Sequence, residues 1–314
     1  YLTICFIGIP CITAYNVLAS IFRGMGDSRS PMYFIAAACV VNIGLDFFFM
    51  GALRLGPAGA ALGTTLSQAV SVLLALCVIL KRRSIRLSKS DFCPRKATMK
   101  DILSIGLPVA AQDGFIQVSF MLITIMANQR GLTDAAAVGI VEKIISFLFL
   151  VPSSMLSTVS ALGAQNIGAG KYDRVDDILR YAIAIGVGFG AVMALLMQFI
   201  APSMVRPFTS DEAVVKAGAA YIRSYIFDCL FAGIQFSFSG YFCAWGRSGL
   251  SFLHNTLSIL LVRVPGAWLA CRFFPQTLVP MGLAPACGSL FSSIVCILLY
   301  RWMKRQNKPT GDKD

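Results

Sequence analysis

The chain has 314 residues, of which 57% are hydrophobic and 13% charged, and its formal net charge is +12. A soluble domain carries about a quarter charged residues, and a folded chain of this size could not hide so much apolar surface from water. The composition therefore excludes an ordinary water-soluble enzyme or binding module and indicates an integral membrane protein.

Nine segments of the sequence are long and apolar enough to cross a bilayer as helices, since a span needs about 20 mostly apolar residues. This predicts an all-α polytopic membrane protein. In chain order, the predicted spans are residues 1–22, 31–53, 57–80, 102–127, 134–160, 177–200, 214–243, 249–273 and 282–303. Because the sequence opens on Tyr1 inside an apolar run, we expect it to be truncated at its N-terminus.

The basic residues are concentrated in the longest connection, between the third and fourth spans. They are Lys81, Arg82, Arg83, Arg86, Lys89, Arg95, Lys96 and Lys100. Lys and Arg are enriched in cytoplasmic loops beside spans, so this charge predicts topology rather than nucleic-acid binding. We expect a multi-pass protein of the plasma (inner) membrane, with this linker and the C-terminus in the cytoplasm.

An internal repeat relates the first three of the nine predicted spans to the last three. Shifting the sequence by 220 residues aligns Tyr1, Phe22, Gly26 and Ser28 with Tyr221, Phe242, Gly246 and Ser248. The first three spans thus match the last three, which predicts three plus six helices as the remnant of a 6+6 bundle in two lobes. Such repeats are typical of transporters. The predicted parts are residues 1–80, the second half of the first lobe, the linker 81–101, the second lobe 102–303 and the tail 304–314.

Several short motifs are spread over both predicted lobes. They are Phe22–Pro31, Asn42 with Asp46, Gly56–Ala61, Gly106–Pro108, Gly139–Lys143, Ala164–Gly170 and Gly240–Ser248. In order and spacing they resemble the multidrug and toxic compound extrusion (MATE) family over nearly the whole chain. The resemblance implies two six-helix bundles that rock about a central cavity. It also implies export of organic cations against inward H⁺ or Na⁺.

Intramembrane acids are the candidates for cation coupling, because a charge in hydrocarbon is costly unless it faces a cavity or a partner. Asp113 shares a helix face with Gln117, and Asp46 shares one with Asn42, each pair at a spacing of i, i+4. A carboxylate taken out of water can exchange a proton near neutral pH. These pairs therefore predict an ion-coupling site, although Asp113 could also be an interfacial residue near the cytoplasmic end.

A third candidate acid, Asp228, lies on a helical stripe with Phe231, Gln235 and Phe238. An acid, an amide and aromatic rings on one face suit an amphiphilic organic cation. Ordinary helix packing with one polar anchor is the alternative.

Glu142 and its neighbour Lys143 form the fourth candidate, either as a coupling acid or as part of a buried ion pair that holds helices together. Arg263 is the other basic residue inside a span, and we expect it to contact a carboxylate across the lobe interface.

No pattern in the sequence supports an enzyme, a metal site or a cofactor. Gly24–Asp27 matches the GxGD of intramembrane proteases, but the required Tyr-Asp partner is found only after it, as Tyr172-Asp173 in a basic loop. We expect a monomer whose partners are the bilayer and small organic cations. The alternatives are a lipid-linked oligosaccharide flippase of the same superfamily, whose cavity should be richer in Arg and Lys, and a non-transporting receptor or scaffold.

Overall fold

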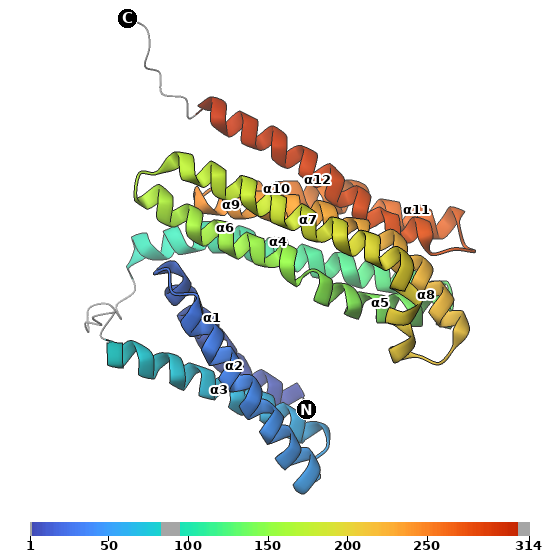
Figure 1. Cartoon of the computed structure of the whole chain (residues 1–314), viewed down its shortest axis with the longest axis horizontal. Coiled ribbons are helices and arrows are strands. Elements are labelled where there is room, and N and C mark those ends of the chain that lie inside the picture. Colours follow the sequence, from blue (N-terminus) through green and yellow to red (C-terminus); the bar gives the residue numbers. More distant parts are fainter. Residues whose placement is uncertain (1, 83–94, 307–314) are drawn as a thin grey trace, which may run out of the picture. The chain divides into compact units, whose positions relative to one another are not determined.

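The computed structural model of the chain describes residues 2–82 and 95–306, and every regular element in these two ranges is a helix (Figure 1). The chain divides into two compact units between Arg95 and Lys96. The predicted all-α class is therefore confirmed. Most of the predicted linker lies outside the described residues, but α3 continues to Arg82 and α4 begins at Lys96, so both helices are longer than predicted.

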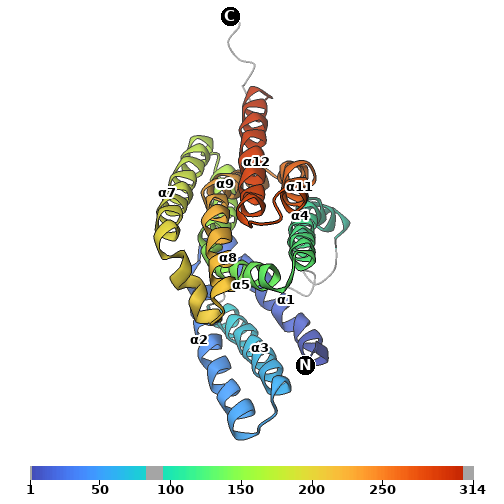
Figure 2. The same ribbon diagram turned by 90° about the vertical axis from the view of Figure 1, so that its right-hand side faces the viewer.

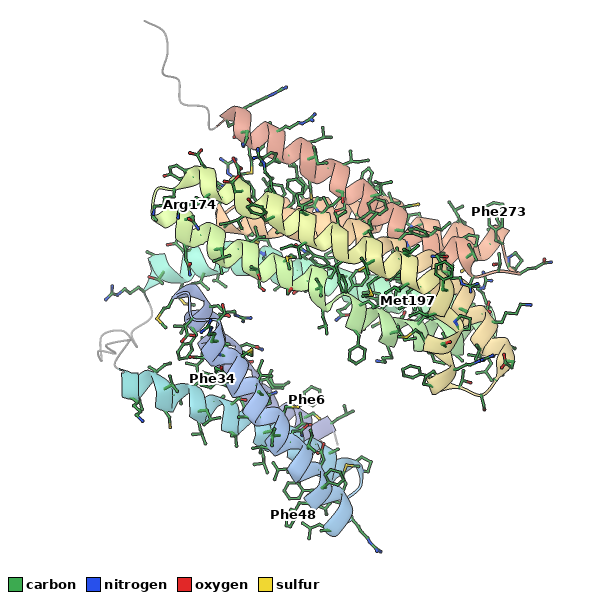
Figure 3. All side chains as sticks on the ribbon, viewed as in Figure 1. Phe6, Phe34, Phe48, Arg174, Met197 and Phe273 are labelled. Atoms are coloured by element: carbon green, nitrogen blue, oxygen red, sulfur yellow. The ribbon has the colours of Figure 1, made fainter. Side chains whose placement is uncertain are left out.

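The first unit contains three long helices. They are α1 (Leu2–Gly24), α2 (Arg29–Asp46), continued by the π-helix η1 (Phe47–Ala52), and α3 (Pro57–Arg82). Helix α3 packs against both α1 and α2. The small core between them includes Tyr15, Phe22 and Phe34. Figure 3 shows Phe6 and Phe48 projecting from this unit, and both are more than half exposed.

The second unit is a larger bundle built around α9. Its elements are α4 (Lys96–Gln129), α5 (Leu132–Leu148), α6 (Leu150–Gly168), α7 (Tyr172–Val205), η3 (Arg206–Phe208), α8 (Glu212–Tyr225), α9 (Phe227–Ala244), α10 (Ser248–Ser258), η4 (Ile259–Arg263), α11 (Val264–Phe273) and α12 (Val279–Gln306). Helix α9 contacts α6, α7, α10 and α12. The end-on view in Figure 2 shows α8 between α7 on one side and α12 on the other.

Within the described ranges, nine helical stretches have the length and apolar character needed to cross a membrane. The predicted number of spans is confirmed. Large apolar side chains such as Phe47, Leu132, Phe147 and Phe199 lie exposed on the outside of the helices, where lipid chains are their natural solvent.

Four predicted spans are interrupted rather than continuous, the first of them being 31–53, which contains the π-helix η1. The segment 134–160 breaks at Phe149, between α5 and α6, because Pro152 has no N–H to donate to the carbonyl of Leu148. That carbonyl instead accepts the thiol of Cys229 at 3.9 Å. The segment 214–243 breaks at Ile226, and the segment 249–273 contains the π-helix η4.

Candidate functional site

The first unit holds a carboxylate that packs against helix backbone. Asn42 and Asp46 lie one turn apart on the same face of α2, directly before η1. A side chain added at Gly63 of α3 would collide with Oδ1 of Asp46 and come within 3.4 Å of Nδ2 of Asn42. The absence of a side chain at Gly63 therefore makes room for the two polar groups.

Both polar groups are left without a partner. Oδ1 of Asp46 and Nδ2 of Asn42 are buried and form no hydrogen bond with any described residue. An unsatisfied buried polar atom costs about 1–3 kcal/mol, so a ligand that satisfies these atoms is favoured. Rotation of the Asn42 amide would turn its oxygen, in place of its nitrogen, toward the same point.

A pocket of about 390 Å³ opens beside Asp46. It is lined by Ile43, Asp46, Phe47, Met50 and Gly51. Most of these residues belong to η1, and single π-helical turns are frequent at functional sites because the extra residue per turn changes where side chains point. The geometry thus places an acid at an accessible volume, with an amide one turn away on the same helix face, which suits a small cation.

The second unit holds a fully buried ion pair. Nη2 of Arg263, at the end of η4, lies 3.2 Å from Oδ2 of Asp228 and donates to the hydroxyl of Tyr225 over 2.9 Å. The guanidinium also lies over the ring of Phe120, 5.1 Å from its centroid. The structure therefore pairs Arg263 with an acid of its own unit, and the expected contact with a carboxylate across the lobe interface stays a prediction.

Glu142 interacts with the two tyrosines beside this ion pair. Its Oε1 accepts a hydrogen bond of 3.0 Å from Thr124, which is one helical turn from Phe120 on α4. Tyr221 and Tyr225 both interact electrostatically with Glu142, Asp228 and Arg263. Lys143 is exposed and forms no salt bridge among the described residues. Two predicted acids, Glu142 and Asp228, are thus brought into one cluster.

The stripe of Asp228 points into the bundle. Gln235 donates to Ser289 of α12 over 3.0 Å, and both residues are buried. Phe238 packs against Phe242 and Tyr300 at centroid distances of 6.1 and 5.7 Å. These contacts are helix packing.

Asp113 and Gln117 remain apart from the other candidates. Both are exposed on α4, while their neighbour Gln112 is buried and accepts a hydrogen bond of 2.7 Å from Ser251. Asp113 and Gln117 therefore lie on the surface of the second unit.

Sequence reasoning did not single out Phe120, Thr124 or Tyr225. The spacing of Tyr225 three residues before Asp228 was a usable signal, since residues three apart share a helix face. His254 was not singled out either, and it is buried between Ser239 and Ser292, with ring nitrogens 3.0 and 2.7 Å from their hydroxyls.

Comparison with known proteins gives consistent matches. The sequence model of the MatE family matches residues 1–48 and 108–269. The probable multidrug resistance protein YpnP of Bacillus subtilis is 30% identical over 305 residues, which are 96% of this chain and 67% of that protein. The multidrug export protein MepA of Staphylococcus aureus strain N315 is 26% identical over 253 residues, 79% of this chain and 55% of that protein.

Solved structures show the same fold. A MATE transporter of Vibrio cholerae, VcmN, superposes with a TM-score of 0.87 at 18% identity, covering 94% of this chain and 66% of that one. A transporter of the MOP superfamily from Pyrococcus furiosus superposes with a TM-score of 0.89 at 22% identity, covering 96% and 68%. The chain thus spans between about half and two thirds of the length of these proteins.

Proposed function

This chain belongs to the MatE family, and from that premise we propose that it works as part of a secondary antiporter. The antiporter exports organic cations in exchange for H⁺ or Na⁺, by alternating access between two lobes in the plasma membrane. Relatives named for multidrug resistance and multidrug export support the export of small organic compounds.

The observation that carries cation coupling is that Oδ1 of Asp46 has no hydrogen-bond partner in the described part of the chain, while Asp46 lines a pocket of about 390 Å³. A charged acid inside a span is costly, so its presence there indicates that it binds a transported ion or exchanges a proton. Asp46 and Asn42 are accordingly the proposed coupling site of the first lobe.

In the second lobe, Glu142 and Asp228 are the proposed coupling acids. Gln235 joins them because it donates to Ser289 of α12, which also interacts with Asp228. Asp113 and Gln117 are proposed as contacts for the organic cation, because they are the exposed polar pair on α4. Coupling requires that the ion and the drug compete, so that loading of one releases the other.

Ethidium efflux from proteoliposomes containing the complete protein tests this function, with pH and Na⁺ gradients imposed separately. One gradient should drive efflux, and Asp46→Asn should abolish it. Asp177→Asn, which changes an exposed acid paired with Arg180 at 3.5 Å, should transport like the parent. Efflux by Asp46→Asn at the parent's rate under both gradients would remove Asp46 from the mechanism.

A further inference from the structure

In the second lobe, the carboxylate of Asp228 is already paired with a cationic side chain. Asp228 is fully buried, and the Arg263 guanidinium neutralises it at 3.2 Å. An incoming cation therefore meets an occupied carboxylate rather than an open site. Buried ion pairs of this kind are favourable only when the remaining hydrogen-bonding groups are satisfied.

Those groups are not satisfied in this arrangement. Oδ1 of Asp228, Nε of Arg263 and Oη of Tyr221 are all buried and have no hydrogen-bond partner among the described residues. The Ser289 side chain also interacts with the Asp228 carboxylate, so the pairing is supported there and left incomplete at these three atoms. A small cation that gained Oδ1 of Asp228 as a ligand would satisfy a group that Arg263 leaves free.

Arg263 also has interactions that do not depend on Asp228. The same Nη2 that faces Asp228 donates to Tyr225 over a shorter distance, 2.9 Å, and the ring of Phe120 lies 5.1 Å from the guanidinium. A hydroxyl and an aromatic face can hold a guanidinium after its carboxylate is neutralised. Arg263 is the last residue of the π-helix η4, a backbone form that often marks functional sites.

We propose that Arg263 is a tethered counter-cation, which occupies Asp228 between transport cycles and is displaced by the coupling cation. This inference rests on the proposed antiport and adds to it a residue that controls access to the acid. The coupling cation is a proton or Na⁺, which share the monovalent charge that Asp228 requires.

Displacement changes the charge of the cluster. With Asp228 paired, the two groups sum to zero, and once a proton or Na⁺ neutralises Asp228 the guanidinium adds one positive charge. The titratable groups that interact with the pair are Tyr221 and Tyr225 from α8 and Cys229 on α9, and Glu142 from α5 interacts with the two tyrosines. Because the added charge repels an organic cation, loading of the ion and of the drug exclude each other.

Cation binding to the purified complete protein tests the proposal without requiring transport. Radioactive Na⁺ binding at constant pH forms one arm, and proton uptake in Na⁺-free buffer forms the other. Arg263→Gln should half-saturate at a roughly tenfold lower cation concentration in one arm, because removing an adjacent positive charge shifts a carboxylate's affinity for cations by about that factor or more. The arm that responds identifies the ion.

Two further variants separate this role from a structural one. Asp228→Asn combined with Arg263→Gln keeps the shape of the pair without charge, and it should lose the gain in cation affinity. A folded Arg263→Gln protein whose affinity is unchanged in both arms would overturn the proposal. If Arg263→Gln does not fold, Arg263→Lys decides. Lysine keeps the charge that competes for Asp228 but holds Tyr225 and Phe120 less well once displaced, so cation binding should weaken several-fold, and unchanged binding would overturn the proposal. Failure of ethidium efflux alone would overturn the proposed antiport and leave these binding results standing.

Discussion

Gly26 and Gly246, 220 residues apart, end their helices with the same left-handed turn, at φ of 86° and 69°. In the first turn the N–H of Asp27 donates to the carbonyl of Phe22 over 2.9 Å, and in the second that of Arg247 donates to Phe242 over 2.8 Å. Both pairs are bonds from C″ to C3 of the Schellman motif. The repeat predicted from residue identities therefore extends to backbone geometry.

Replacing Gly246 with Ala should destabilise the protein by about 1–2 kcal/mol, because a left-handed conformation forces Cβ toward the next carbonyl. No atom lies within 4 Å of the added Cβ, so the loss would come from the backbone alone. Thermal unfolding in detergent measures the effect. Gly249→Ala, three residues later with equally open space but no positive φ, is the matched control and should change stability little.

Replacing Gly63 with Ala should impair cation coupling, because the new Cβ would collide with Oδ1 of Asp46. Displacing an ion-binding oxygen or its support typically costs about tenfold or more in affinity. Cation-dependent ethidium efflux measures the loss. Gly44→Ala, on α2 itself and with no atom within 4 Å of its Cβ, should leave efflux unchanged. Equal efflux in both variants would contradict the coupling site proposed at Asp46.

Replacing Arg130 with Met should release the connection between α11 and α12. Its guanidinium donates to the carbonyls of Phe274, Pro275 and Thr277 and pairs with Asp134 at 2.7 Å. Hydrogen bonds from a charged donor are worth about 1.5–3 kcal/mol each, and water replaces part of that here, so we expect a loss of about 1–3 kcal/mol in thermal unfolding.

The control for this change is Arg206→Met, which removes an exposed pair with Glu212 at 3.4 Å. Exposed ion pairs contribute less than about 1 kcal/mol. If the two variants lost similar stability, the carbonyl contacts of Arg130 would contribute no more to stability than an exposed ion pair.

Replacing Gly190 with Ala should separate α7 from α9. A Cβ at Gly190 would lie 2.6 Å from Cα of Leu230, and one at Gly186 would lie 2.8 Å from Cα of Gly233. Small residues four apart let membrane helices approach closely, and overpacking such a contact costs about 1–3 kcal/mol. Gly188→Ala, between them with no atom within 4 Å, should be neutral or slightly stabilising in the same unfolding assay.

Much of the fold could be predicted because the bilayer imposes local rules. Each span must satisfy its own backbone hydrogen bonds, so length and apolar content alone locate the helices. The breaks at Phe149 and Ile226 were missed, since both residues lie in apolar runs that look continuous. Pro152 was the visible signal for the first break, and the second has no comparable mark.

The site was less predictable than the fold. The spacing of Asn42 and Asp46 correctly placed them on one face, but the role of Gly63 depends on a different helix. Asp228 looked like an open acid on an aromatic stripe, and the structure places it opposite Arg263, 35 residues along the chain. A charge in a span has the same sequence signature whether it is paired or free.

The sequence by itself determined the membrane class, the helical spans, the glycine turns and the family, because these follow from properties repeated along the chain or within one turn of it. Only the tertiary structure decided which charges meet. It paired Arg263 with Asp228, placed Glu142 within hydrogen-bonding distance of Thr124, and left Oδ1 of Asp46 with no hydrogen-bond partner in the described ranges. The physical reason is that the cost of a buried charge depends on atoms a few ångströms away, and those atoms belong to other helices.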